Sequence, residues 1–281
     1  MGMEPGRVRR RSSGYRDQDL DLYPSGDDEP SCESPWHGDS MQNFRDLLIG
    51  LRELRGKEKE WYVGRDNFWY YREGDGTARL TPDVMFIPNV EDAHEDRDSW
   101  LDWLENGQRP TVIYEVLAPR CWRDNLHGKK DTCETLGVVE YFLFDPRGDF
   151  VEERFQGFRL VDGSYERIAP DAHGRLESRE LDAWIWPNER LLHLIDRVSG
   201  REIRTLAHAD AEAKRLRWLE KSEAERAQIE RSNAIWELRQ ASGMAELHKT
   251  GDPLILEYEE ARVAKLRAAL RAMGIDPDNL P

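Results

Sequence analysis

The chain has 281 residues, of which 35% are charged, and its 56 acidic residues against 41 Lys and Arg give a formal net charge of -15. This balance argues against a general affinity for nucleic-acid phosphates, which depends on clustered Lys and Arg, so a nucleic-acid substrate would need local contacts. No apolar run approaches the roughly 20 residues that cross a bilayer, and residues 1–19 lack a signal-peptide core, so we expect a cytoplasmic protein with no membrane partner.

The first part of the chain predicts a tail and then a helix. Residues 1–35 contain a basic run, an acidic run and then mostly Pro, Ser, Gly and Asp. Such a segment buries too little apolar surface to offset its ordering entropy, which predicts a disordered tail. From Met41 to Leu54, apolar residues recur at intervals of three and four, which predicts an amphipathic helix covering one side of a sheet.

Short aromatic and β-branched runs separated by turn residues follow, which is typical of strands. The expected strands are 60–63, 67–71, 80–87 (interrupted by Pro82), 111–116 and 141–144. The last two runs are continuously apolar, as central strands are. Between them, residues 124–136 have a helical composition and end at Gly137, which predicts a helix with a C-terminal glycine cap.

The remainder of the predicted globular domain, residues 36–204, consists of short elements. Residues 91–110 are acidic and polar, and an apolar cluster near Trp100 and Leu104 suggests one short helix there. Further strands are expected at 152–160, 165–168, 184–186 and 191–195.

Residues 205–281 are rich in Ala, Glu, Arg, Leu and Lys, which favours helices at 207–248 and 254–273. An apolar seam runs through the first of them without forming clean heptads; it comprises Leu206, Ala209, Ala213, Leu216 and Leu219. Two interpretations stay open, a coiled-coil extension that pairs with a partner and a solvated helix with a charged surface.

The three cysteines, Cys32, Cys121 and Cys133, have no C-x-x-C spacing and cannot all pair. The sequence therefore predicts neither a structural zinc site nor a disulfide framework.

Two acidic residues stand at predicted strands. Asp83 follows Pro82, and Glu115 interrupts the apolar run 112–117. A carboxylate in such a strand is seldom buried unless it is paired or binds a metal. Two carboxylates on neighbouring strands suit a hard divalent cation, and a lysine such as Lys129 can stabilise a negatively charged transition state. The structural alternative is that Glu115 faces solvent while Asp83 caps a turn, and spacing alone does not decide between them.

A family resemblance rests on the order and spacing of several segments: Pro82-Asp83-Val84, Tyr114 to Pro119, the linker with Lys129, Leu136 to Pro146, and Leu270 to Asp278. On these segments the chain resembles the Uma-two family of putative restriction endonucleases, a branch of the PD-(D/E)XK nuclease superfamily. The resemblance covers roughly residues 36–200 and recurs at the C-terminus. It implies an α/β (α+β) fold, with a restriction-endonuclease-like mixed sheet flanked by helices and a C-terminal helical extension. It also implies metal-dependent cleavage of phosphodiester bonds, with DNA as the expected nucleic acid.

The resemblance also implies the site residues. Asp83 and Glu115 would be catalytic acids that bind Mg²⁺, with Mn²⁺ as the alternative, and the backbone carbonyl of Val116 would be a further metal ligand. The superfamily places a lysine two residues after the second acid, where this chain has Leu117. In this family a helix lysine substitutes for it, and Lys129 stands at the expected place.

Lys130 would face about 100° away from Lys129 on a helix, so the register favours Lys129 as the catalytic lysine. Three positions depart from the family pattern: Ala118 replaces a serine, Asn125 replaces an aspartate and Cys133 replaces a tyrosine. These departures change residues that would support the metal-binding acids and the lysine.

Two functional hypotheses follow. The first is a Mg²⁺-dependent endonuclease that forms a homodimer through its C-terminal helices. The second is a binding or assembly module whose nuclease-like core has lost catalysis. A glycosidase that uses the same acid pair is disfavoured, because the helix lysine would have no role in it.

Other polar and aromatic residues have simpler interpretations. His37 precedes the first predicted helix, where relatives often carry a histidine, but we expect a lone exposed side chain. Glu140 and Asp145 are expected to serve the ends of their strand. Four aromatic residues could stack nucleobases, although their strand positions favour a core face; they are Trp61, Trp69, Tyr70 and Tyr71.

Overall fold

A computed structural model describes residues 22–23, 35–119, 121–249 and 253–280. The chain divides into two compact units: Met1–Leu117 with Arg123–Thr205, and Ala118–Trp122 with Leu206–Pro281. The predicted disordered tail falls, apart from residues 22, 23 and 35, outside the described residues.

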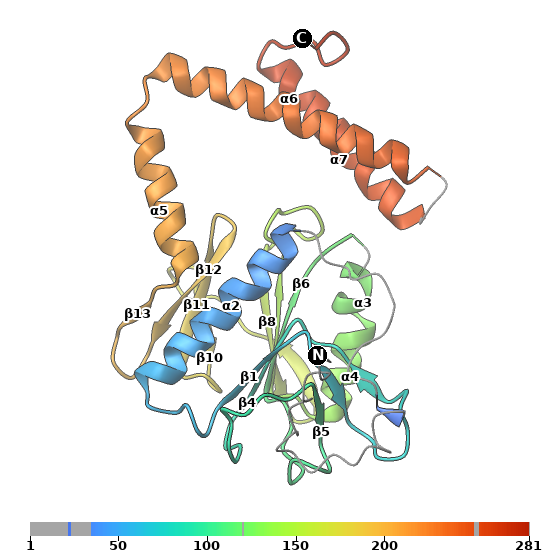
Figure 1. The fold of residues 1–281 in the computed structure, drawn as a ribbon, viewed down its shortest axis with the longest axis vertical. Helices are drawn as coiled ribbons and strands as arrows, with labels where there is room; N and C mark the ends of the chain where they lie inside the picture. Colours follow the sequence, from blue (N-terminus) through green and yellow to red (C-terminus); the bar gives the residue numbers. More distant parts are fainter. Residues whose placement is uncertain (1–21, 24–34, 120, 250–252, 281) are drawn as a thin grey trace, which may run out of the picture. The chain divides into compact units, whose positions relative to one another are not determined.

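A six-stranded mixed sheet forms the centre of the first unit, in the order β1-β4-β6-β7-β8-β9 (Figure 1). Neighbouring strands are antiparallel except β6 and β7, which are parallel. The strands are β1 Tyr62–Arg65, β4 Val84–Ile87, β6 Val112–Val116, β7 Glu140–Phe144, β8 Phe155–Val161 and β9 Ser164–Arg167. Parallel neighbours require a crossover, which α3 (Trp122–Leu126) and α4 (Gly128–Leu136) supply.

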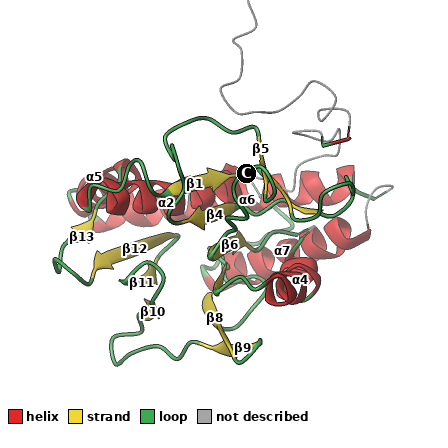
Figure 2. Cartoon of the chain, turned by 90° about the horizontal axis from the view of Figure 1, so that it is seen from below, coloured by secondary structure: helices red, strands yellow, loops and turns green. Residues whose placement is uncertain are grey.

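Helix α2, Pro35–Leu54, packs against both the central sheet and a second, antiparallel sheet. The strands of the second sheet form a separate group in Figure 2; they are β10 Leu176–Ser178, β11 Ala183–Asn188, β12 Leu191–Asp196 and β13 Glu202–Ile203. The predicted apolar stripe of α2 is buried in one continuous core with both sheets; it comprises Met41, Phe44, Leu47, Leu48 and Leu51. The helix thus joins the two sheets through apolar burial.

The central strands are buried on both faces, as their continuous apolar runs predict. Val112, Tyr114 and Val116 of β6 belong to the core shared with α2. Because side chains alternate along a strand, Ile113 and Glu115 point to the opposite face. The crossover helix α4 supplies the partner of Glu115 on that face.

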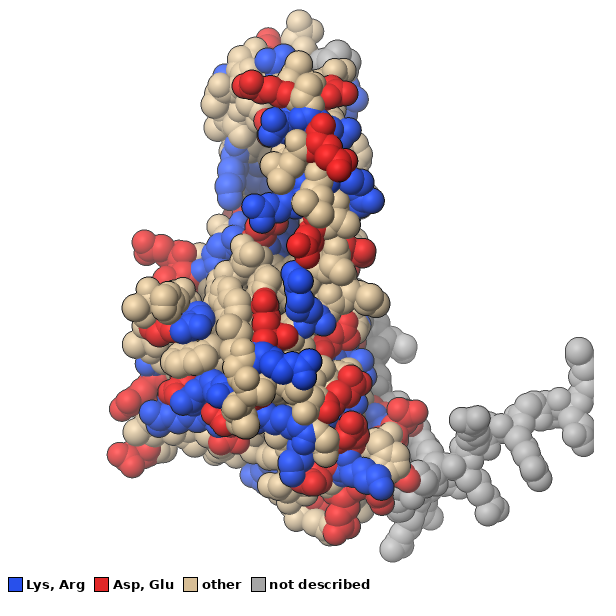
Figure 3. Space-filling view, turned by 90° about the vertical axis from the view of Figure 1, so that its left-hand side faces the viewer, with Lys and Arg blue, Asp and Glu red and all other residues tan. Residues whose placement is uncertain are grey.

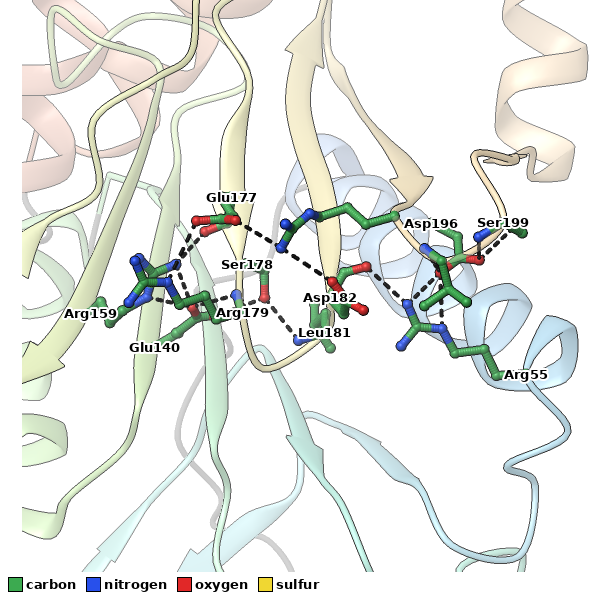
Figure 4. Close-up of polar contacts among 12 residues, drawn as sticks. Arg55, Glu140, Arg159, Glu177, Ser178, Arg179, Leu181, Asp182, Asp196 and Ser199 are labelled. Carbon is green, nitrogen blue, oxygen red and sulfur yellow. Dashed lines mark hydrogen bonds and ion pairs between the residues drawn. The ribbon is translucent and has the colours of Figure 1, made fainter.

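Two buried carboxylates hold the second sheet in place: Glu140 links it to the central sheet, and Asp196 links it to the end of α2 (Figure 4). Glu140, fully buried at the start of β7, accepts hydrogen bonds from Ser178 Oγ at 2.5 Å, the Arg179 backbone N–H at 2.9 Å and Arg159 Nε at 3.0 Å. At the end of β12, Asp196 accepts hydrogen bonds from the Arg55 guanidinium. Burial of these charges is tolerated because each has a cation and further hydrogen bonds.

Asp145 closes the other end of β7. Its carboxylate accepts backbone N–H groups of the following turn, from Arg147, Gly148, Phe150 and Val151. Glu140 and Asp145 therefore serve the ends of the strand, as predicted.

The prediction of a short helix in residues 91–110 is wrong. Ser99–Leu101 forms β5, which pairs in parallel with β2 (Phe68–Tyr70), and β3 (Arg79–Leu80) completes a small three-stranded sheet. Trp100 and Leu101 are fully buried there. Strand pairing with a distant segment overrides the local pattern in this case.

Two predicted helices are interrupted. The helix expected at 124–136 is divided between α3 and α4 at His127, whose backbone leaves the helical region at φ -128° and ψ -82°. The helix expected at 207–248 is two helices, because Ser222 and Glu225 form a capping box that starts α6. Gly137 ends α4 in the left-handed conformation, as predicted.

The second unit is helical, with α5 Leu206–Leu219, α6 Glu223–Leu247 and α7 Pro253–Ala272. Helices α6 and α7 pack against each other, whereas several large apolar side chains are exposed, among them Leu206, Trp236 and Leu247. None of the described helices combines the length and apolarity of a membrane span. The fold class is therefore confirmed as a mixed sheet flanked by helices, with a helical C-terminal extension.

We predict that Phe44→Ala destabilises the fold. The Phe44 ring is fully buried and stacks on Tyr114 with ring centroids 4.2 Å apart. Its removal leaves a cavity between α2 and the central sheet, so the free energy of unfolding should fall by about 3–5 kcal/mol in a urea titration.

The matched control for this cavity is Val198→Ala, since Val198 is 71% exposed. It should change the free energy of unfolding by less than about 0.5 kcal/mol. Similar losses in both variants would mean that the contact between α2 and the sheet does not carry this stability.

Candidate active site

The structure brings Asp83 and Glu115 together at one end of adjacent strands. Val84 of β4 pairs with Tyr114 of β6 in antiparallel register, so the next pair outward places Asp83 opposite Glu115. The backbone N–H of Asp66 donates to the Asp83 carbonyl at 3.2 Å, which continues the contact with β1 beyond the strand. Asp83 is therefore held by its backbone at the end of an interior strand of the sheet.

The Asp83 side chain is oriented by two groups. Its Oδ2 accepts a hydrogen bond from the Val116 backbone N–H at 2.6 Å, and His37 Nε2 lies 3.2 Å from the same oxygen. Its Oδ1 makes no hydrogen bond within the described part of the chain, and the side chain is 13% exposed. One carboxylate oxygen is thus fixed while the other remains available to a ligand.

His37 is not the exposed histidine that we expected. It is 2% exposed in the first turn of α2 and contacts Asp83. His37 lies four residues before Met41, so it extends the apolar stripe of α2 by one turn toward the sheet. That spacing is the signal by which the sequence could have placed it.

Glu115 is fully buried, which excludes the solvent-facing alternative. Lys129 Nζ donates to Glu115 Oε2 at 2.9 Å and to the Thr81 carbonyl at 3.0 Å. Burial raises the pKa of Glu115 above its ordinary value, the Lys129 ammonium opposes that rise, and the charge of Asp83 adds to it. Glu115 Oε1 has no hydrogen-bond partner among the described residues.

The two neighbouring lysines of α4 face different surroundings. Lys129 reaches Glu115, whereas the ammonium of Lys130 lies 4.6 Å from the ring centroid of Phe158 on β8. The helical register thus brings Lys129, and not Lys130, to Glu115. Its catalytic role stays a prediction.

The two backbone polar groups of Val116 bind different side chains of the site. Its N–H binds Asp83, and its carbonyl accepts a hydrogen bond from Asn125 Nδ2 at 3.3 Å. Asn125 is buried, and an ionised aspartate at this position could not donate to a carbonyl. The carbonyl that the resemblance implies as a metal ligand is therefore already engaged by an amide.

The other departures from the family pattern are buried. Ala118 and Cys133 are fully buried, and burial raises the pKa of the Cys133 thiol above its usual value. Cys133 is therefore a neutral packing residue, because nucleophilic cysteines need a lowered pKa. Cys121 and Cys133 form no disulfide with any described residue, and Cys32 lies outside the described residues.

The donor atoms fit a hard cation. Asp83 Oδ1, Glu115 Oε1 and the Val116 carbonyl are oxygens, the ligands that Mg²⁺ prefers, and the unpartnered buried Oε1 is the observation that favours such an ion. No group of three His, Cys, Asp or Glu that could hold a metal occurs in the described ranges. The protein would supply two carboxylates, and Mg²⁺ ordinarily retains several waters.

Most of the aromatic residues that could stack nucleobases lie in the core of the described chain. Trp61, Trp69 and Tyr70 are buried, which confirms the core interpretation for these three. On the face drawn in Figure 3, basic and acidic side chains are interspersed. Contacts with a phosphate backbone would therefore be local on this face.

One comparison with known proteins shows the family of this chain. A family model described as "Uma2: Putative restriction endonuclease" matches residues 16–186. Among solved structures, the chain is similar to a putative nuclease belonging to DUF820 from Anabaena variabilis, at 15% identity and a TM-score of 0.37. That similarity covers 53% of this chain and 75% of the other. Among curated proteins, no sequence matches this chain.

We predict that Lys129→Met strongly destabilises the fold at neutral pH, because the folded protein must then bury Glu115 without its cation, either as a charge or after taking up a proton. The expected loss in the free energy of unfolding is about 3–5 kcal/mol by urea titration. The double variant Glu115→Gln/Lys129→Met removes both charges and should recover most of that loss.

The pH dependence of Lys129→Met gives an independent check. The folded-state pKa of Glu115 is raised, so the folded state holds a proton that the unfolded chain releases at a lower pH. Stability should therefore fall as pH rises above the ordinary carboxyl range and return as pH is lowered toward it. Equal losses in the single and double variants at all pH values would contradict the buried pair.

Proposed function

We propose that this chain, which belongs to the Uma2 family of putative restriction endonucleases, hydrolyses phosphodiester bonds in DNA with a divalent metal ion. The observation that carries the proposal is the convergence of Asp83, Glu115 and Lys129, from three separate segments, at one end of the central sheet. Two oxygen donors with an adjacent cation are what phosphoryl chemistry requires: a metal site and a group that stabilises negative charge.

Asp83 and Glu115 would hold the metal, through the oxygens that have no hydrogen-bond partner in the described chain. Mg²⁺ is the proposed ion and Mn²⁺ the alternative, with the Val116 carbonyl as a further donor. A bound ion of this kind polarises a phosphoryl oxygen and lowers the pKa of a coordinated water. The Val116 N–H and His37 fix the orientation of Asp83 for this purpose.

Lys129 would stabilise the charge that develops on the phosphate. Its position is set by Glu115 and by the Thr81 carbonyl, 2.9 and 3.0 Å from Nζ. A preoriented ammonium in a partly buried site acts more strongly than one in water, because less solvent screens it. Lys129 also compensates the Glu115 charge, so it would serve the fold and the chemistry together.

A second candidate is a binding or assembly module that has lost catalysis. The observation that favours it is the hydrogen bond from Asn125 to the Val116 carbonyl, which uses one of the two lone pairs of a proposed metal donor. In either case we propose that two copies associate through the C-terminal helices, whose exposed apolar side chains include Leu216 and Trp236.

We predict that Asp83→Asn and Glu115→Gln each lower Mg²⁺-dependent cleavage of plasmid DNA by roughly a hundredfold or more. Both changes remove a negative oxygen donor but keep nearly the same side-chain shape. The measurement is the rate of supercoil loss, together with a circular-dichroism spectrum that confirms the fold.

Glu166→Gln is the matched control, since Glu166 is an exposed acid on β9. It should cleave at the wild-type rate. Cleavage by both site variants at that same rate would refute the assignment of Asp83 and Glu115, and inactivity of the wild-type protein with every metal would favour the module.

We predict that binding of Mg²⁺ or Mn²⁺ strengthens with rising pH through the neutral range. The raised pKa of Glu115 keeps it partly protonated without metal, and binding must release that proton. The affinity measured by calorimetry should rise by up to about tenfold per pH unit below the pKa of that group. Glu115→Gln should abolish this dependence, and a wild-type affinity that does not change with pH would rule out proton release from Glu115.

A further inference from the structure

Tyr23 lies against the small sheet β3-β2-β5, and Leu22 lies against the turn at Gly76. The Tyr23 side chain is 6% exposed, and its ring centroid lies 5.1 Å from that of Tyr70 and 4.9 Å from that of Trp103. We call the residues that receive this ring, Phe68, Tyr70, Leu101 and Trp103, the aromatic socket. Tilted and edge-on ring pairs of this kind stabilise a contact beyond the burial of their area.

The turn between β2 and β3 also contacts Leu22 and Tyr23. The Gly74 backbone N–H donates to Tyr23 Oη. A Cβ at Gly76 would meet the carbonyl oxygen of Leu22 well inside 3.0 Å. The close approach of the Leu22 backbone therefore requires glycine at position 76. Backbone conformation does not explain this glycine, because its φ is not positive.

This turn leads directly to the candidate active site. Arg79 of β3 donates to the Gly76 carbonyl at 3.1 Å, and β3 ends at Leu80. The next residue, Thr81, provides the carbonyl that binds Lys129, and Asp83 follows two residues later. A strand of only two residues has little stability of its own, so its position depends on the contacts of the adjoining turn.

We propose that Leu22–Tyr23 acts as an intramolecular docking strap, in which this segment of the chain occupies the aromatic socket and holds the β2–β3 turn. By holding the turn it positions β3 and, through it, Thr81 and Asp83. The occupant is the chain's own segment and not that of a second copy. The docking is independent of the proposed nuclease function, and only its consequence for cleavage depends on that function.

Hydrogen exchange measured by mass spectrometry on the full chain tests the strap. Tyr23→Ala empties the socket, and Tyr23→Phe keeps the ring but loses the Gly74 hydrogen bond. Gly76→Ala displaces Leu22 while leaving both residues of the strap unsubstituted. In Tyr23→Ala and Gly76→Ala, amides of residues 68–83 should exchange about tenfold faster, with Tyr23→Phe between these and wild type.

Two internal references make this result specific. Amides of β7 should keep their wild-type exchange, and Gly243→Ala, whose new Cβ has no neighbour within 4 Å, should leave residues 68–83 unchanged. Unchanged exchange in Tyr23→Ala and Gly76→Ala would overturn the strap. A uniform acceleration that includes β7 would also overturn it, because it would indicate global destabilisation.

The dependence on protein concentration shows whether the segment in the socket comes from the same chain or from a second copy. Protection of residues 68–83 should be constant over about a hundredfold dilution, because intramolecular docking does not depend on concentration. Loss of protection on dilution would assign the segment to a second copy and overturn the proposal. Since exchange is measured without substrate, failure of the nuclease assignment leaves this test intact, and a slower cleavage rate in Tyr23→Ala would connect the two.

Discussion

The burial of Glu115 is the constraint on which the rest of the site depends. A carboxylate with no exposed surface, in a central strand, needs a cation or a proton. Lys129 provides the cation within the protein, from the helix that connects the parallel strands β6 and β7. The crossover that the sheet topology requires thus also places the ammonium beside the carboxylate.

The same burial gives Glu115 a property that an exposed acid would lack. One oxygen is bound by Lys129 and the other has no partner in the described chain, at a position opposite Asp83 in the strand register. A charged oxygen left unpaired in a protein interior is costly, and a bound metal ion would offset that cost. Site and stability are therefore connected, and a change at Lys129 affects both.

Helix α2 has a comparable double role. Its apolar stripe joins the two sheets into one core, and its first turn places His37 against Asp83. Thr81 directly follows β3 of the small sheet, and Tyr23 packs against that sheet. The candidate active site is consequently held by segments from the start of the described chain to α4, and none of them forms it alone.

The sequence by itself determined the elements whose pattern is local: the amphipathic stripe of α2, the continuous apolar runs of β6 and β7 and the cap at Gly137. It also singled out the two acids and the lysine that the structure brings together. Only the tertiary structure decided the burial of Glu115 and of His37, the strand at Ser99–Leu101 and the engagement of the Val116 carbonyl by Asn125. Each of these features depends on a contact with a residue in another helix or strand. Periodicity reports the neighbours within one element, whereas the energy of a buried charge or an isolated short strand comes from contacts between elements.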